Sequence, residues 1–511
     1  MRNSYMMFNC TNKLVLTMVS ALFASALWGQ ETAIVAIDSK TILGPVNPMV
    51  FGNNISCFKG NGSWTQSSET GAGRWDPATH SVQQDYLAAC KDIGIKLERY
   101  PSGTDAEAYV WTDFVGPKET RPKCLFGLDE WITWCKALGA EPLFTVNSHS
   151  TPQQAADMMD YLNGPADDAH PWAQKRAAWG HVEPYHVKYF ELGNETYFER
   201  KRFPTGAAYA DWAEPVDHAM RSRSPGIQIG LVSKFNWGSD STEWNESVFS
   251  RKTIGDFAVQ HSYPNGCEPE NYANEDIGMG ELMIASEQFA AMYRRIHNRI
   301  QELSGRDFPL AVTEYNGYFL AGEEKFKKYE YYLRSWGNAF FCGDLVREML
   351  LPSNHVLMAN YFITDLQVGR RFQRLPAYFV YRLWSQHTGS TLVSSKVEAS
   401  PRVKFGRRID IIKPTETSAI STLASRRENG TICLMLFNRE MRSDISTTIR
   451  VEGRAVVGAK YWQVTSPTLA NNNRDNANME TVSGDAVVPT SGSITVNLPK
   501  FSMTAIELDV R

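Results

Sequence analysis

From residue 47 to residue 385 the chain alternates short runs rich in β-branched and aromatic residues with longer stretches of helical periodicity. This alternation predicts an α/β fold in which parallel strands are joined by crossover helices. Eight strands are expected, at Met49–Ser56, Lys96–Tyr100, Pro142–Asn147, Val187–Glu195, Ile227–Ser233, Phe257–Tyr263, Leu310–Asn316 and Val356–Ile363. Eight such units favour a (β/α)8 TIM barrel. The alternative, an open doubly wound sheet, is disfavoured because no glycine-rich phosphate loop follows an early strand.

The sequence changes character after Ser385, where helical patterns stop. The runs that follow alternate apolar and polar residues, as antiparallel sandwiches do, at Thr431–Asn438, Ser446–Val451, Ala459–Thr465 and Ser493–Leu498. The strand-like segment 30–46 is expected to join them. We therefore predict a catalytic barrel over 47–385 and a C-terminal antiparallel β-sandwich accessory domain built from 30–46 and 386–511. A chain of 511 residues has room for both, since single cores stop growing near ~250–300 residues.

The first residues have the pattern of an export signal. Arg2 and Lys13 supply positive charge, Leu14–Leu27 is mostly apolar, and Ala24-Ser25-Ala26 offers small residues for cleavage. The apolar run is shorter than the ~20 residues of a spanning helix. The pattern predicts a signal peptide over 1–29, a secreted or periplasmic protein, and no membrane association after signal removal. An uncleaved N-terminal anchor is the alternative.

Charge and cysteine spacing exclude several classes of partner. The net charge is −4 and the isoelectric point about 6.2, whereas nucleic acids and anionic membranes attract concentrated basic surfaces. No nucleic-acid partner is expected. The eight cysteines do not follow a Cys-x-x-Cys zinc pattern. Neither a metal site nor a cofactor is expected.

Two glutamates stand where a barrel of this kind carries its chemistry, at the carboxyl ends of strands. Glu195 is expected to end the fourth strand and Glu314 the seventh. Glycoside hydrolysis needs two carboxyl groups across the scissile bond, one that donates a proton and one that attacks or stabilises the sugar carbon. The pair therefore favours a glycosidase. The alternative is two exposed strand-end glutamates without a catalytic role.

Neighbouring residues strengthen the first interpretation. Asn194 can bind a sugar hydroxyl beside the reacting carbon. His261 and Tyr263 end the sixth predicted strand, where a tyrosine could hydrogen-bond a nucleophilic glutamate. Glu191 shares the inward parity of Glu195, because strand side chains alternate. We expect Glu191 to be structural and paired with a barrel arginine.

Four segments resemble glycoside hydrolase family 51, the clan A α-L-arabinofuranosidases: Arg99–Trp111, Gly193–Glu195, His261–Tyr263 and Thr313–Asn316. The resemblance implies an exo-acting retaining enzyme on plant or algal polysaccharide or oligosaccharide, with Glu195 as acid/base and Glu314 as nucleophile. It also implies a raised pKa at Glu195, a lowered pKa at Glu314, and carboxyl groups about 5–5.5 Å apart. A homo-oligomer is compatible with it. The residues expected to bind substrate are Arg99, Thr104, Trp111, Asn147, Asn194, His261, Tyr263 and Asn360.

Two departures from the family pattern fall in the sugar pocket. Ser56 stands where the family has a sugar-binding glutamate, and Thr104 where it has an asparagine. Because such groups discriminate between sugars, another clan A activity stays open, such as an endo-glucanase, a β-xylosidase or another furanosidase. A carbohydrate-binding protein without catalysis is a third alternative. The basic run with Arg370, Arg371 and Arg374 could bind an acidic sugar, although a solvated loop is the simpler interpretation.

Overall fold

The computed structural model describes residues 31–55, 70–121, 124–236, 239–240, 242–264, 282–317, 334–362, 374–404, 416–473, 479–486 and 492–511. These residues belong to one compact unit that begins at Glu31. The predicted signal peptide, Ser56, Arg370 and Arg371 lie outside the described residues.

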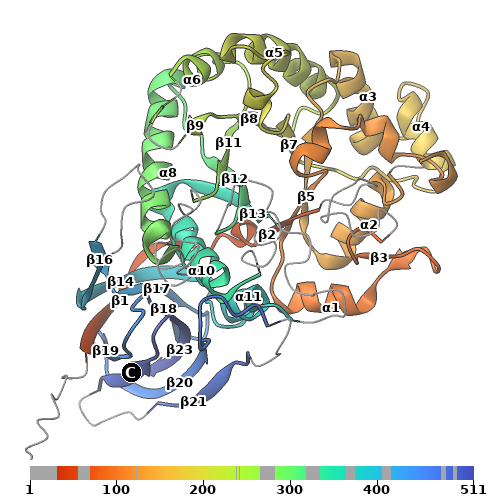
Figure 1. The fold of residues 1–511 in the computed structure, drawn as a ribbon. Helices are drawn as coiled ribbons and strands as arrows, with labels where there is room; N and C mark the ends of the chain where they lie inside the picture. The colour runs from red at the N-terminus through yellow and green to blue at the C-terminus, as the bar shows by residue number, and fades with distance from the viewer. Residues whose placement is uncertain are drawn as a thin grey trace, which may run out of the picture. The chain divides into compact units, whose positions relative to one another are not determined.

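Eight parallel strands close into a barrel, which confirms the predicted fold class (Figure 1). In barrel order they are β2 (Gly52–Asn54), β5 (Leu97–Tyr100), β6 (Glu141–Val146), β7 (Tyr189–Leu192), β8 (Gln228–Val232), β11 (Phe257–Ser262), β12 (Leu310–Tyr315) and β13 (Val356–Tyr361). Each overlaps one of the eight predicted segments. Their residues are almost all buried, as expected for parallel strands covered by helices on the outside.

Helices follow the strands along the chain and lie around the barrel (Figure 1). They are α1 (Gln84–Asp92), α2 (Leu128–Leu138), α3 (Pro152–Asn163), α4 (Pro171–Ala178), α5 (Gly206–Arg223), α6 (Thr242–Phe249), α8 (Leu282–Ser304), α10 (Trp336–Leu350) and α11 (Pro376–Gln386). Local sequence fixes several ends. Thr151 and Gln154 form a capping box that starts α3, and Gly139, at φ +73°, ends α2.

A nine-stranded sheet forms the second domain. Its strand order is β21 (Val482–Asp485), β20 (Val456–Val464), β23 (Ser502–Val510), β18 (Ile432–Asn438), β17 (Ile420–Arg426), β14 (Thr391–Ala399), β1 (Glu31–Pro45), β19 (Ile445–Val451) and β22 (Ile494–Leu498). All pairs are antiparallel except β1 with β19. β1 therefore lies inside the sheet, between strands that come more than 340 residues later in the chain.

Strand β18 differs from its sequence pattern. Alternation in Thr431–Asn438 predicts one solvated face, yet all seven residues of the strand are buried. Ile432, Leu434 and Leu436 pack into the sheet's own core. Phe437 points the other way, and its ring lies 5.5 Å from Phe340 of α10. Helix α10 is buried along its whole length for the same reason, because it lies between the barrel and the second domain.

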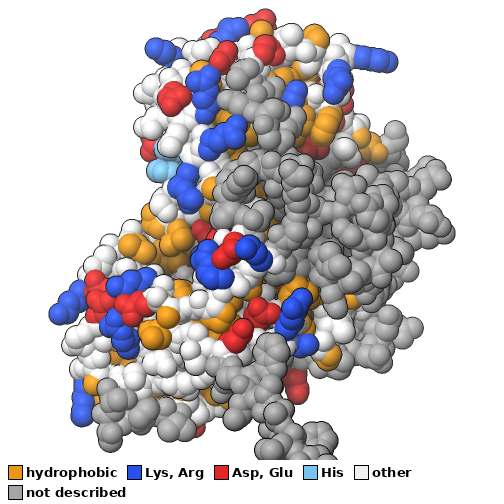
Figure 2. All heavy atoms as spheres, turned by 60° about the vertical axis from the view of Figure 1, so that its left-hand side comes forward, with side chains coloured by type: hydrophobic (Ala, Val, Ile, Leu, Met, Phe, Trp, Pro, Cys, Tyr) orange, Lys and Arg blue, Asp and Glu red, His pale blue; other side chains and the backbone are white. Residues whose placement is uncertain are grey.

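Charged side chains are mixed on the surface. On the coloured part of the face in Figure 2, Lys and Arg side chains lie beside Asp and Glu side chains. Arg450 and Glu398 are 2.7 Å apart, and Lys404 and Glu416 are 3.0 Å apart. None of the helices within the described residues combines the length and apolarity needed to cross a membrane.

Candidate active site

Glu314 and Glu195 reach the same end of the barrel by different backbone routes. Glu314 is the penultimate residue of β12 and is buried. The expectation that Glu195 ends a strand is wrong, because β7 ends at Leu192. Gly193 (φ +82°) and Glu195 (φ +45°) are left-handed, so the chain turns sharply after the strand. This turn, rather than strand pleating, directs the Glu195 side chain.

One histidine bridges the two carboxylates. His261, from β11, places Nδ1 3.0 Å from Glu195 Oε1 and 3.4 Å from Glu314 Oε2. The expected tyrosine contact is present, since the Tyr263 hydroxyl donates to Glu314 Oε2 at 2.5 Å. Tyr197 donates to Glu195 Oε1 at 3.1 Å. The two glutamates thus share one hydrogen-bonded cluster.

Arg99 lies beneath this cluster and is fully buried. Its NH1 donates to Glu314 Oε1 at 2.8 Å, and its NH2 donates to Asn194 Oδ1 at 2.8 Å. Arg99 also forms an ion pair with Glu191, and it is therefore the barrel arginine that Glu191 was expected to pair with. Arg99 has no exposed surface with which to touch a sugar. In this structure Arg99 holds Glu314 and Asn194 in place, and its expected contact with substrate stays a prediction.

The pKa of Glu195 is lowered, whereas the family resemblance implies a raised value. Burial raises the pKa of this carboxyl, but the hydrogen bond and charge of His261, with Tyr197 and Arg99, outweigh burial and lower it. The expected raised pKa is therefore wrong for this geometry. For His261, burial lowers the pKa, while the charge of Glu314 and the bond to Glu195 raise it above its usual value. A proton is thus held more firmly on the imidazole than on Glu195.

Two expected substrate-binding residues stand next to the carboxylates. Asn194 is buried directly before Glu195. Thr104 is exposed in the 3-10 helix η2 (Gly103–Glu107), which follows β5. A Cβ on the preceding Gly103 would lie 3.9 Å from Glu314 Oε1. The loop with the altered residue therefore runs beside the second carboxylate.

Three others contact the surrounding strands and loops, and their expected binding of substrate stays a prediction. Asn147 donates to the carbonyl oxygens of Ala106 and Tyr109, both at 3.0 Å. The Trp111 ring is buried 4.6 Å from that of Trp172. Asn360 donates to the Asn53 carbonyl at 3.0 Å. The described residues do not bring these three side chains into hydrogen-bond contact with either glutamate.

Sequence reasoning missed two polar residues of the site. Asn54, at the end of β2, accepts from Arg99 NH1 at 3.1 Å and donates to three carbonyl oxygens of β12 and β13. The position of Asn54 at the end of a strand could have identified it from the sequence. Glu107 accepts hydrogen bonds from Asn194 and Ser148. It sits within a loop, where no strand or helix pattern marks it.

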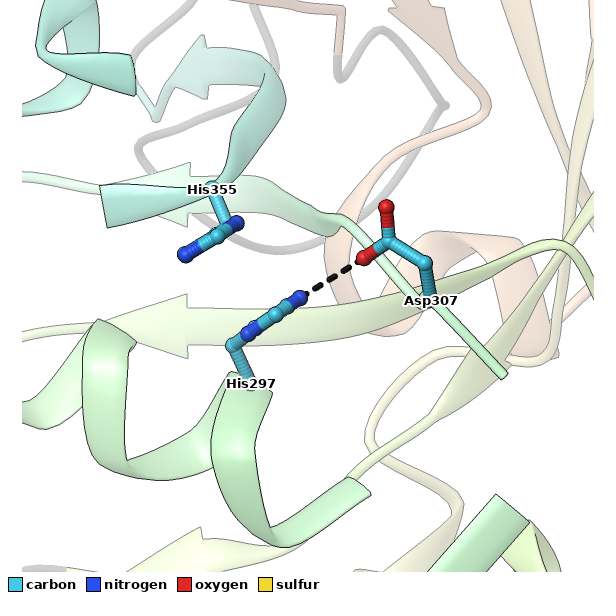
Figure 3. A group of neighbouring side chains, drawn as sticks. All are labelled: His297, Asp307 and His355. Carbon is cyan, nitrogen blue, oxygen red and sulfur yellow. Dashed lines mark hydrogen bonds and ion pairs between the residues drawn. The ribbon is translucent and has the colours of Figure 1, made fainter. Parts of the chain in front are cut away.

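A histidine–aspartate group lies at the opposite end of the barrel. His297, Asp307 and His355 bring metal-ligand atoms within 4.8 Å of one another (Figure 3). Asp307 precedes β12 and His355 precedes β13. The two imidazoles stack with centroids 3.6 Å apart and planes 3° apart. An ion bound in the plane of one ring would miss the plane of the other, so this arrangement favours a hydrogen-bonded stack over a metal centre.

Comparison of the sequence with known proteins finds α-L-arabinofuranosidases. Residues 89–276 match the model of the alpha-L-arabinofuranosidase 1 domain. A probable alpha-L-arabinofuranosidase C of Aspergillus niger is 38% identical over 180 residues, which are 32% of this chain and 35% of the fungal protein. The chain thus aligns with about a third of the length of such fungal relatives. An exo-alpha-(1->6)-L-arabinofuranosidase of Bifidobacterium longum is 22% identical over 94% of this chain and 97% of its own.

Solved structures share the whole architecture. The α-L-arabinofuranosidase of Thermotoga maritima, solved with arabinose, has a TM-score of 0.75 at 22% identity and covers 93% of this chain and 99% of its own. AbfB of Bifidobacterium longum, described as a family 51 α-L-arabinofuranosidase, has a TM-score of 0.78 at 19% identity over 94% of this chain and 100% of its own. These similarities show the TIM barrel with its C-terminal β-sandwich.

Proposed function

Because the chain is arabinofuranosidase-like in sequence and has the fold of the family 51 structures, we propose that it is a retaining glycoside hydrolase. Its proposed substrate is a terminal α-L-arabinofuranosyl residue on a plant or algal polysaccharide or oligosaccharide. Glu195 is the proposed acid/base and Glu314 the proposed nucleophile.

The bridge through His261 carries this proposal. One nitrogen touches both carboxylates, so their nearest oxygens cannot be farther apart than the sum of the two contacts of 3.0 and 3.4 Å. The ~5–5.5 Å separation of a retaining pair is compatible with that limit, whereas most of the ~6.5–9.5 Å range of inverting pairs lies above it. The two contacts therefore favour direct attack by a carboxylate over attack by a water held between sugar and base.

The contacts suggest how each residue acts. Tyr263 and Arg99 each donate to a different oxygen of Glu314, which fixes the direction of the carboxylate. Glu314 attacks the anomeric carbon while Glu195 gives a proton to the departing oxygen, and a covalent glycosyl-enzyme forms. Glu195 then removes a proton from water, which attacks the anomeric carbon and frees Glu314. The proton donated in the first step is recovered in the second.

Turnover on a panel of aryl glycosides tests the proposal. The panel holds α-L-arabinofuranoside, β-D-xyloside, β-D-glucoside and β-D-galactofuranoside, with Glu314→Ala as control. We expect the wild type to release the aryl group from the arabinofuranoside, and we expect Glu314→Ala to lower this turnover at least about 10³-fold. NMR of the first-formed sugar should show retained anomeric configuration. Inversion, or unchanged activity in the variant, would refute the assignment of Glu314.

The residue at position 104 bears on which sugar the pocket binds. Thr104 offers a single hydroxyl, whereas an asparagine side chain offers a carbonyl oxygen and a separate NH2 group. The loop that carries Thr104 runs beside Glu314. Release from a different glycoside alone would mean that the pocket has been redirected while the glutamate pair is kept. Absence of turnover on every glycoside, with sugar affinity retained in Glu195→Ala, would favour a binding protein.

We also propose that the protein is exported. The support is the positively charged start, the apolar run Leu14–Leu27 and the small residues Ala24–Ala26. Export would place the enzyme with its polymeric substrate. N-terminal sequencing of protein recovered outside the cytoplasm should show a start near residue 30, whereas an intact Met1 in a membrane fraction would indicate an anchor.

A further inference from the structure

One carboxylate joins three loops at the catalytic end of the barrel. Glu107 ends η2, which follows β5, and its Oε1 accepts from the backbone N–H of Asn194 at 2.6 Å. Its Oε2 accepts from the backbone N–H of Ser148 at 2.9 Å and from the Ser148 hydroxyl at 2.6 Å. Ser148 follows β6 and Asn194 follows β7. The loops after three consecutive strands therefore meet on this side chain.

The bond to Asn194 acts on a strained turn. Gly193 and Glu195, on either side of Asn194, have φ values of +82° and +45°. A glutamate seldom adopts this conformation, so contacts around it must maintain it. A Cβ on Gly193 would lie 3.2 Å from Glu107 Oε1, which shows how closely the carboxylate approaches the turn.

We propose that Glu107 is a positioning residue that holds the Gly193–Glu195 turn and thereby aims the Glu195 carboxyl at the leaving-group oxygen. This inference rests on the proposed function, in which Glu195 is the acid/base. Glu107 does not contact the reacting atoms. His261 and Tyr197 hold the Glu195 side chain, whereas Glu107 holds the backbone that carries it.

A glutamine at position 107 isolates this role. Its size matches glutamate, but only one end of its amide accepts hydrogen bonds, while the other end donates. In either orientation its NH2 group opposes a backbone N–H, that of Asn194 or that of Ser148, so glutamine cannot link the two loops as glutamate does. Asp113→Asn is the matched control, because Asp113 is exposed on the same stretch of chain and, within the described residues, accepts a hydrogen bond only from the nearby Val110 N–H at 3.0 Å.

Two leaving groups distinguish positioning from general damage. A 2,4-dinitrophenolate departs without a proton, whereas a methoxide must be protonated as it leaves. Both glycosides are made of the sugar that the wild type hydrolyses, and kcat/KM is measured because it reports the first chemical step. We expect Glu107→Gln to lower kcat/KM about 100-fold on the methyl glycoside, as for a small misplacement of a catalytic group, and little on the dinitrophenyl glycoside. Asp113→Asn should change neither.

The possible results distinguish failure of the positioning role of Glu107 from failure of the proposed hydrolase function. An equal loss on both substrates, or no loss on the methyl glycoside, would overturn the positioning role. If Glu107→Gln does not yield folded protein, Ser148→Ala replaces it, since it removes one of the three donors; a smaller split in the same direction supports the role, and no split overturns it. A wild type inactive on both glycosides of every sugar would remove the proposed function and this inference together.

Discussion

At the residue scale, His261 decides the electrostatics of the site. Its imidazole contacts both glutamates, and its pKa is raised by the charge of Glu314 and the bond to Glu195. Glu195, in turn, has a lowered pKa. The acid role proposed for Glu195 therefore requires that bound substrate raise this pKa.

The His261 contact also gives a stability that depends on pH. A group whose folded-state pKa is raised stabilises the fold fully below its unfolded pKa, about 6.5 for histidine, and this stabilisation is lost as pH rises through the folded pKa. We expect His261→Gln to cost about 1.5–3 kcal/mol near pH 6 and progressively less toward pH 9. Urea unfolding of both proteins at several pH values measures the difference. A cost that grows with pH would contradict the proposed charge on His261.

Tyr263 is the second residue-scale test. Its hydroxyl donates to Glu314 Oε2 at 2.5 Å, and phenylalanine removes this donor while keeping the ring near Phe362. We expect Tyr263→Phe to lower kcat about 10²-fold, as loss of one preorganised donor does elsewhere, with little change in melting temperature. Steady-state kinetics and thermal unfolding check this together. A drop in stability without a change in kcat would show that the tyrosine only supports packing.

At the element scale, the turn after β7 is the most demanding connection in the site. A β-carbon on Gly193 would lie 2.3 Å from Thr196 Cγ2, so alanine requires a shift in addition to left-handed strain. We expect Gly193→Ala to cost about 1–3 kcal/mol and to lower kcat/KM, because Glu195 moves with the turn. Gly139→Ala is the control. It has φ +73° with no atom near its would-be Cβ, and should lose stability without losing activity.

At the scale of the whole molecule, a buried ion cluster joins the barrel to the β-sandwich. Arg439, which follows β18, contacts Asp344 of α10 at 2.6 Å and Glu287 of α8 at 2.5 Å. Burial raises the pKa of Asp344, but Arg347 and Arg439 outweigh it and hold the pKa well below its usual range. Such a lowered carboxyl pKa adds stability above the unfolded pKa of about 4, which is lost as pH falls further.

Breaking this cluster should destabilise both domains together. Arg439→Met leaves Glu287 without its arginine contact and Asp344 with Arg347 alone, and we expect a loss of about 3–5 kcal/mol in the free energy of unfolding. Arg450→Met removes a pair with the partly exposed Glu398 and should cost at most about 1 kcal/mol. Urea unfolding followed by tryptophan fluorescence measures both. Equal effects would mean that the buried cluster does not join the domains.

The sequence by itself determined the eight barrel strands, the later β-rich domain and the two glutamates. Hydrophobic periodicity is local, and residues at strand ends meet once a parallel barrel closes. It also indicated the Glu191–arginine pair, because strand parity fixes which side chains face inward, and the Tyr263 contact, because Tyr263 follows directly after a barrel strand.

Tertiary structure alone decided the rest. Four features depend on contacts between strands and loops far apart in sequence: the left-handed turn that carries Glu195, the role of Glu107, the burial of Arg99 and the lowered pKa of Glu195. Burial of both faces of β18 likewise needed α10 beside it. Periodicity reports which residues leave water, but only the packed fold determines which charges and hydrogen-bond partners they then meet.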